Sequence, residues 1–143
     1  MKRKILVIDD EKHMLSLLER TLTAEDTIVT GLTDGEEAIK FVDSNDVDLV
    51  ITDISMPKMQ GTDLFFALKK MNPFLEIIII TAYPSLENIT KMLEGGASDF
   101  VIKPFDVDQI RAVVDESFSR IARWKSLRKE WLQYKKMRVE KDA

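Results

Sequence analysis

The sequence contains no cysteine and only one histidine. Without cysteine there are no disulfides, no thiolate metal sites and no cysteine nucleophile. The single histidine, His13, has no histidine partner, so we interpret it as a solvated surface residue rather than a phosphodonor or metal ligand.

Long hydrophobic runs are also absent. The longest purely aliphatic run, residues 77–80, is far too short to cross a bilayer. Near the basic start, only four apolar residues precede Asp9 and Asp10, too few for the core of a signal peptide. The sequence therefore predicts a soluble cytoplasmic protein without membrane insertion.

The charges are distributed unevenly along the chain. Residues 1–120 carry 13 Lys+Arg against 22 Asp+Glu, a net charge of −9, whereas residues 121–143 carry 8 against 3, a net charge of +5. An acidic body argues against direct nucleic-acid binding. With 45% hydrophobic residues the chain can build a packed core, and we expect one domain over residues 1–120 followed by an extension over 121–143.

Strand and helix patterns alternate five times along the chain. Aliphatic runs predict strands at about 4–8, 27–31, 48–53, 76–81 and 99–102. Helical periodicity predicts helices at about 11–24, from 34 past 42, at 61–71 and 85–95, and from 106 onward. Short loops between such elements favour right-handed crossovers. We therefore predict an α/β fold, a three-layer αβα sandwich with a five-stranded parallel sheet of order 2-1-3-4-5. The more polar second strand suits an edge.

Polar residues follow four of these strands, at the point where each strand ends. They are Asp9 and Asp10, Asp53, Thr81 and Lys103. Because ligands of open parallel sheets bind beyond the carboxyl ends of the strands, we expect these side chains to converge. Carboxylates attract a hard divalent cation, and an ammonium and a hydroxyl suit a phosphoryl group. The pattern predicts a metal-assisted phosphoryl acceptor with Asp53 as the nucleophile.

Each of these residues also has an ordinary structural explanation. The acidic pair and Asp53 could cap helices, and Thr81 could be a plain strand residue. One rival function is a metal-dependent phosphohydrolase with an Asp nucleophile, although such enzymes normally need a second acid where this chain has Ser55. Another is an interaction module that is never phosphorylated.

Three longer motifs carry a resemblance to a known family. They are the run from Lys4 to Glu11 (KILVIDDE), the run from Asp53 to Gly61 (DISMPKMQG), and Thr81-Ala-Tyr followed by the run from Gly96 to Phe105 (GASDFVIKPF). Together, in this order and spacing, they resemble the receiver domains of two-component response regulators over about residues 3–119. The resemblance implies the same αβα sandwich that the strand and helix pattern predicts.

The resemblance assigns a role to each site residue. It implies that Asp53 accepts the phosphoryl group, that Asp9, Asp10, Asp53 and the backbone carbonyl of Ser55 hold Mg²⁺ (or Mn²⁺), and that Lys103 contacts the phosphoryl oxygens. Thr81 and Phe100 would form a switch pair that alters the face built by the fourth helix, fifth strand and fifth helix. The expected donor is a sensor histidine kinase or a phosphotransfer protein. The chain would be a signalling domain rather than an enzyme.

The extension has its own pattern. No glycine or proline occurs between residues 117 and 137, and apolar residues recur at helical spacing: Ile121, Trp124, Leu127, Trp131 and Tyr134. One interpretation is a solvated helical stalk. The other is a homodimer formed through the last helix, because two exposed tryptophans on one stripe require a partner surface. A nucleic-acid or membrane-surface role is weaker, since the basic charge is modest.

Overall fold

The computed structural model describes residues 2–56 and 59–142. Strands and helices alternate in this order: β1 (Arg3–Ile8), α1 (Lys12–Leu22), β2 (Thr27–Leu32), α2 (Gly35–Ser44), β3 (Leu49–Asp53), α3 (Gly61–Met71), β4 (Glu76–Thr81), α4 (Leu86–Glu94), β5 (Asp99–Ile102) and α5 (Val107–Asp142). Apart from the end of α1, these limits lie within one residue of the predicted strands and helices.

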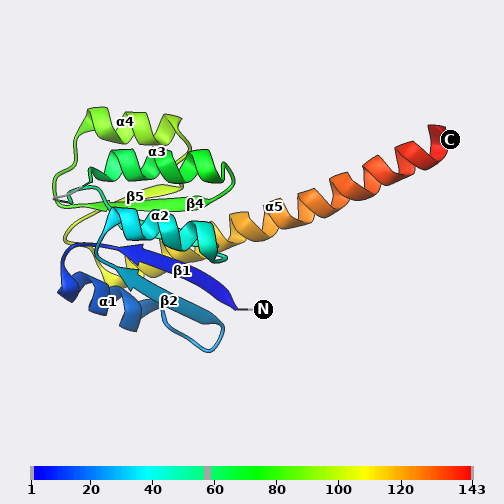
Figure 1. Cartoon of the computed structure of the whole chain (residues 1–143). Helices are drawn as coiled ribbons and strands as arrows, with labels where there is room; N and C mark the ends of the chain where they lie inside the picture. Colours follow the sequence, from blue (N-terminus) through cyan, green and yellow to red (C-terminus); the bar gives the residue numbers. More distant parts are fainter. Residues whose placement is uncertain (1, 57–58, 143) are drawn as a thin grey trace.

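The five strands form one parallel sheet with the order β2-β1-β3-β4-β5. This confirms the predicted α/β sandwich, including the edge position of β2. Helices α2, α3 and α4 lie on one face of the sheet and α1 and α5 on the other (Figure 1).

Alternating residues of the central strands build two hydrophobic cores, one on each face. In β1, Ile5 and Val7 point toward α1 and α5, while Leu6 and Ile8 point toward α2 and α3. Such strands need apolar residues at every position, which explains why β3 and β4 are entirely buried. Because both faces are packed, the polar residues that end these strands can reach solvent only at the edge of the sheet.

Strand register brings those ends together. Ile8 is paired with Thr52, so Asp9 and Asp53 follow side by side at the ends of β1 and β3. Thr81 is paired with Ile102, so Lys103 leaves β5 beside the end of β4. The site is therefore fixed by the same hydrogen-bond ladders that hold the sheet.

Local signals set the limits of α4. Its N-cap residue, Ser85, accepts a hydrogen bond from the backbone N–H of Asn88 (3.1 Å), which satisfies one free donor of the first turn. After the helix, Gly96 adopts φ = +96°, a conformation that favours glycine and lets the chain turn into β5.

Helix α5 runs far past the body of the domain as a single helix through Asp142 (Figure 1). An ion pair joins α5 to the sheet: Arg120 Nε lies 3.0 Å from Glu76 Oε1 at the start of β4. Ser98 Oγ donates to the other oxygen of Glu76, and Arg120 also donates to Ser117 Oγ at 3.1 Å. Within the described residues, no helix is both long enough and apolar enough to span a membrane.

Candidate functional site

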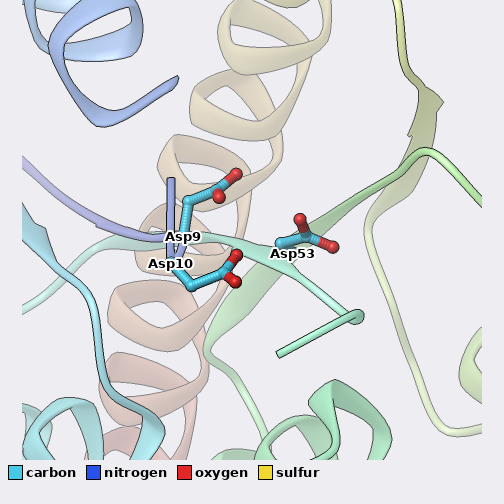
Figure 2. A group of neighbouring side chains, drawn as sticks. All are labelled: Asp9, Asp10 and Asp53. Carbon is cyan, nitrogen blue, oxygen red and sulfur yellow. The ribbon is translucent and has the colours of Figure 1, made fainter. Parts of the chain in front are cut away.

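Three carboxylates meet where β1 and β3 end. Oxygen atoms of Asp9, Asp10 and Asp53 all lie within 4.8 Å of one another. Figure 2 shows the three side chains as neighbours. Asp9 and Asp53 are buried and Asp10 is exposed, so the cluster opens to solvent on one side.

Lys103 joins this cluster from the end of β5. Its Nζ lies 2.8 Å from Asp53 Oδ2 and 3.0 Å from Asp9 Oδ2, and only 10% of its side chain is exposed. Burial alone would lower the pKa of Lys103, but the hydrogen bonds to Asp53 and Asp9 outweigh it and raise that pKa. Lys103 therefore stays an ammonium ion that holds both carboxylates.

Asp9 is the most buried acid of the cluster. Burial raises the pKa of its carboxyl, against the lowering effects of the Glu11 backbone N–H (2.9 Å) and of Lys103. Three carboxylates facing one ammonium leave an excess of negative charge in a confined crevice. Oxygen ligands of this kind are those that Mg²⁺ prefers, so the residues present fit a magnesium ion.

The Asp53 carboxylate is held at both oxygens. Lys103 contacts Oδ2, and the backbone N–H of Ser55 donates to Oδ1 at 2.8 Å. The chain then folds back so tightly that a Cβ on Gly61 would lie 2.1 Å from the Cα of Ile54. Only glycine fits there, which explains the glycine that ends the motif begun by Asp53. Two residues of that motif, Pro57 and Lys58, lie outside the described residues.

Thr81 is fully buried at the end of β4, and its Oγ1 accepts a hydrogen bond from the backbone N–H of Tyr83 (3.0 Å). Its backbone carbonyl accepts from the N–H of Lys103 (2.7 Å), which ties the ends of β4 and β5 together. Phe100 is half-buried against the core beneath α2, α3 and α4. Their roles as a switch pair remain predictions.

The predicted residues Asp9, Asp10, Asp53 and Lys103 are thus brought together by the fold. Besides its ion pair with Asp53, Lys103 forms a second one with Asp9, which the sequence patterns above did not indicate. The signal was available in the pairing of β1 with β3, because that register sets Asp9 beside Asp53.

Known proteins resemble this chain in sequence and in fold. A family model described as Response regulator receiver domain matches residues 5–115. The transcriptional regulatory protein TcrA of Mycobacterium tuberculosis is 34% identical over 109 residues, which cover 76% of this chain and 43% of that protein. The DNA-binding transcriptional regulator NtrC of Escherichia coli is 34% identical over 120 residues, covering 83% of this chain and 26% of that protein. The match thus spans less than half of these curated relatives.

Solved structures show the same fold. A CheY-like response regulator receiver domain protein from Methanospirillum hungatei superposes with a TM-score of 0.83 at 26% identity, covering 86% of this chain and 98% of that one. A response regulator receiver domain protein from Clostridium thermocellum gives a TM-score of 0.77 at 31% identity, covering 87% and 98%.

Proposed function

Because this chain belongs to the response regulator receiver domain family, we propose that it accepts a phosphoryl group on Asp53 and passes that signal on through a change of its surface. The observation that carries this proposal is the Asp53 carboxylate, held by Lys103 and by the Ser55 N–H beside two further acids. Family members interact with histidine kinases or phosphotransfer proteins, and we take such a protein to be the donor here.

The transfer requires one bond to form and one to break. An oxygen of Asp53 attacks the phosphorus of a phosphohistidine, and the O–P bond of an acyl phosphate forms as the N–P bond breaks. The imidazole leaves with the electron pair of that bond and takes a proton from solvent. Lys103 already contacts Asp53 Oδ2, so its ammonium lies close enough to pair with a phosphoryl oxygen after the transfer.

The acids beside Asp53 would hold the metal ion. We assign Asp9, Asp10, Asp53 and the backbone carbonyl of Ser55 as ligands of Mg²⁺, with Mn²⁺ as a substitute, because this set consists of hard oxygen donors. When bound, the ion would neutralise part of the charge on the phosphoryl oxygens. Without the ion, the ammonium of Lys103 offsets the negative charge of one carboxylate.

Phosphorylation adds about −1.5 to −2 charge beside Thr81, and we propose that the Thr81 hydroxyl turns toward it. That movement gives up the hydrogen bond from the Tyr83 N–H and opens space for the half-buried Phe100. The face formed by α4, β5 and α5 would then change shape. Phe100 has no hydroxyl, so it reports the change by packing alone.

We further propose that residues 1–120 are the receiver unit and that α5 with its extension, residues 121–143, mediates self-association. Ala143 lies outside the described residues. The acidic body argues against DNA as the partner of the receiver unit. Since phosphohistidine is made from ATP, we place the exchange in the cytoplasm.

The phosphohydrolase alternative gains no support from the site or from the comparisons. Ser55 stands where a second acid would be needed, and its N–H is engaged with Asp53. The family also favours a phosphorylated domain over a purely passive interaction module.

Incubation with acetyl phosphate and Mg²⁺, followed by intact-mass measurement, tests the proposal. We expect one added phosphoryl group that hydroxylamine removes, as it removes acyl phosphates, and none on Asp53→Asn. Asp63→Asn is the matched control: it removes a carboxylate outside the site, in α3, and should be phosphorylated normally. Undiminished labelling of Asp53→Asn would refute the acceptor assignment, and repeated turnover of assorted phosphate esters would favour the hydrolase.

A further inference from the structure

A groove of about 810 Å³ lies where α5 leaves the body of the domain. One wall is the body itself, with Val47, Phe74 and Leu75 in the loops that precede β3 and β4. The other wall is α5 between Ile121 and Leu132, about 16 Å of helix at 1.5 Å per residue. The groove is therefore elongated, and its length matches about three turns of a second helix laid beside α5.

Three large aromatic rings are exposed in this groove. Phe74 is 76% exposed, and Trp124 and Trp131 are each more than half exposed. Contiguous exposed apolar surface marks binding sites, and tryptophan is among the residues that contribute most to binding energy at interfaces. Because the rings stand on both walls, an occupant of the groove contacts the body and α5 at the same time.

The side of α5 that lines the groove carries charge of one sign. Successive residues of a helix are about 100° apart, so one side is formed by residues 121, 124, 125, 128, 131, 132 and 135. Its charged members are Lys125, Arg128 and Lys135, whereas Glu130 projects to the opposite side, about 200° from Arg128. Within the described part of the chain Arg128 forms no ion pair. Lys135 lies over the Trp131 ring, 5.3 Å from its centroid, so its ammonium borders the apolar surface.

Acidic residues lie at the end of the groove nearest the body. Asp48 accepts a hydrogen bond from the backbone N–H of Lys4 (2.9 Å) and lies 3.7 Å from Lys125 Nζ. Asp43 and Asp46 line a depression that adjoins the groove. The charge thus changes from acidic beside the body to basic farther along α5, and a complementary occupant carries its acids opposite the basic part.

An amphipathic helix fits this shape better than a membrane or a compact ligand. A flat bilayer could not reach between two walls, and the net charge of −9 on residues 1–120 would be repelled by anionic lipids. A compact ligand would cover only part of the length of the groove. A helix that lays its apolar side in the groove contacts both walls along that whole length.

We propose that the groove binds an acidic amphipathic helix of another protein, with its apolar side against Phe74, Trp124 and Trp131 and its carboxylates opposite Arg128 and Lys135. This goes beyond the phosphoryl acceptor function and does not depend on it. The tryptophans also belong to the apolar stripe to which self-association is assigned above. A bound helix and a second copy therefore exclude each other.

Tryptophan fluorescence of the full chain tests the proposal, because Trp124 and Trp131 are its only tryptophans and both line the groove. The probe is a synthetic peptide of about 18 residues, long enough to form a helix, with leucines on one side, glutamates beside them and no tryptophan. We expect the emission to shift to shorter wavelength and sedimentation to show one chain with one peptide. The same peptide with glutamine in place of glutamate should bind about tenfold or more weakly, since the cations then lack partners. Equal binding of the two peptides, or a complex that contains two chains, overturns the proposal.

Charge reversal at Arg128 is the sharper test. Arg128→Glu should weaken binding of the acidic peptide about tenfold or more, and it should favour a peptide with lysine in place of glutamate. Arg123→Glu is the matched control, because it makes the same change at an exposed position about 140° away around the same helix. It should change binding by less than about twofold. Equal effects of the two reversals would show that only net charge matters, and the groove would not be the binding site.

Phe74→Ala tests the wall formed by the body. We expect the dissociation constant of the acidic peptide to rise about tenfold or more, as for loss of a central aromatic contact. Tyr83→Ala is the matched control, because Tyr83 is equally exposed (77%) but follows the other end of β4. An unchanged constant for Phe74→Ala would show that the body takes no part and would overturn the proposal.

Vesicles of phosphatidylglycerol provide the last comparison. If they shift the tryptophan emission and the acidic peptide does not, the surface binds membranes and the proposal is wrong. None of these measurements uses phosphorylation. A failed phosphoryl transfer would therefore leave this proposal standing, and the reverse also holds.

Discussion

At the scale of single residues, the site places two buried carboxylates beside one ammonium. Lys103 satisfies an oxygen of both Asp9 and Asp53, but it cannot balance the charge of the whole cluster. The raised pKa of Asp9 is the consequence, since burial penalises its ionised form. The metal-free receiver is therefore less stable than the same fold with a neutral group in this position.

Asp9→Asn tests this directly. The pKa of Asp9 is raised above its ordinary value of 3.8, so the folded chain holds that proton more tightly than the unfolded chain does. Stability is then lost as pH rises from 3.8 through the raised value. In EDTA at neutral pH we expect the variant to unfold at higher urea concentration than the wild type, with the difference shrinking as pH falls toward 3.8.

Asp10→Asn serves as the control, because that carboxylate is exposed and its removal should change metal-free stability less. Added Mg²⁺ should stabilise the wild type by mass action and the Asp9 variant much less. If Asp9→Asn is less stable than the wild type in EDTA, the interactions of the Asp9 carboxylate outweigh the cost of burying its charge. The expected destabilisation by Asp9 would then be wrong.

At the scale of elements, β4 and β5 connect the site to α5. Thr81 and Lys103 are joined by a backbone hydrogen bond at one end of these strands, and Glu76, Ser98 and Arg120 interact at the other. A change at Thr81 thus starts on the strands that also hold the last helix.

Thr81→Ala separates phosphorylation from its consequence. The variant keeps Asp53 and Lys103, so it should still accept a phosphoryl group, but it has no hydroxyl to turn toward that group. We expect the amide NMR signals of α4 and β5 to change on phosphorylation of the wild type and to change little in the variant. A full response in Thr81→Ala would show that the surface changes by another route.

Arg120→Ala tests how much the ion pair between α5 and β4 contributes to stability. Glu76 is buried and would lose its ion-pair partner, keeping only the hydrogen bond from Ser98 and the weaker attraction of Lys69. Because Arg120 itself is partly exposed, we expect the free energy of unfolding to fall by about 1–3 kcal/mol, below the cost for a fully buried pair. Arg123→Ala, on an exposed part of the same helix, should change it by less than about 0.5 kcal/mol. Equal effects of the two variants in urea unfolding would rule out a special role for this ion pair.

At the scale of the molecule, the fold was predictable because its signals are local. Aliphatic runs such as residues 77–80 are typical of buried strands, and α4 lies within the range of about 85–95 that helical periodicity predicts. Side-chain pairs that are distant in sequence and lie outside the candidate site were not predictable. The contact of Arg120 with Glu76 joins residues 44 positions apart, and sequence alone treats Glu76 as the start of a strand. The groove beside Phe74 likewise depends on the direction in which α5 leaves the body.

The extension of α5 either stabilises the receiver domain itself or is ordered only when two copies associate. The last residue of α5 that packs against the core is Ile121, and the residues of the helix beyond it are almost all exposed. Because most helical stability in proteins comes from packing of an apolar face, the order of this exposed part of α5 should depend on pairing. Truncation after Arg123 keeps Arg120 and Ile121. It should leave a monomeric domain that is still phosphorylated, with a free energy of unfolding within about 1 kcal/mol of that of the full chain.

Helicity measured by circular dichroism should rise with concentration for the full chain and stay constant for the truncation, since only the full chain can pair. The double variant Trp124→Ala, Trp131→Ala is the control that keeps every charge of the extension. If it behaves like the truncation, apolar burial provides the association; if it behaves like the wild type, the basic charges do. A truncation that unfolds several kcal/mol more easily at low concentration would instead make the extension part of the receiver's own stability. The division at residue 120 would then be wrong.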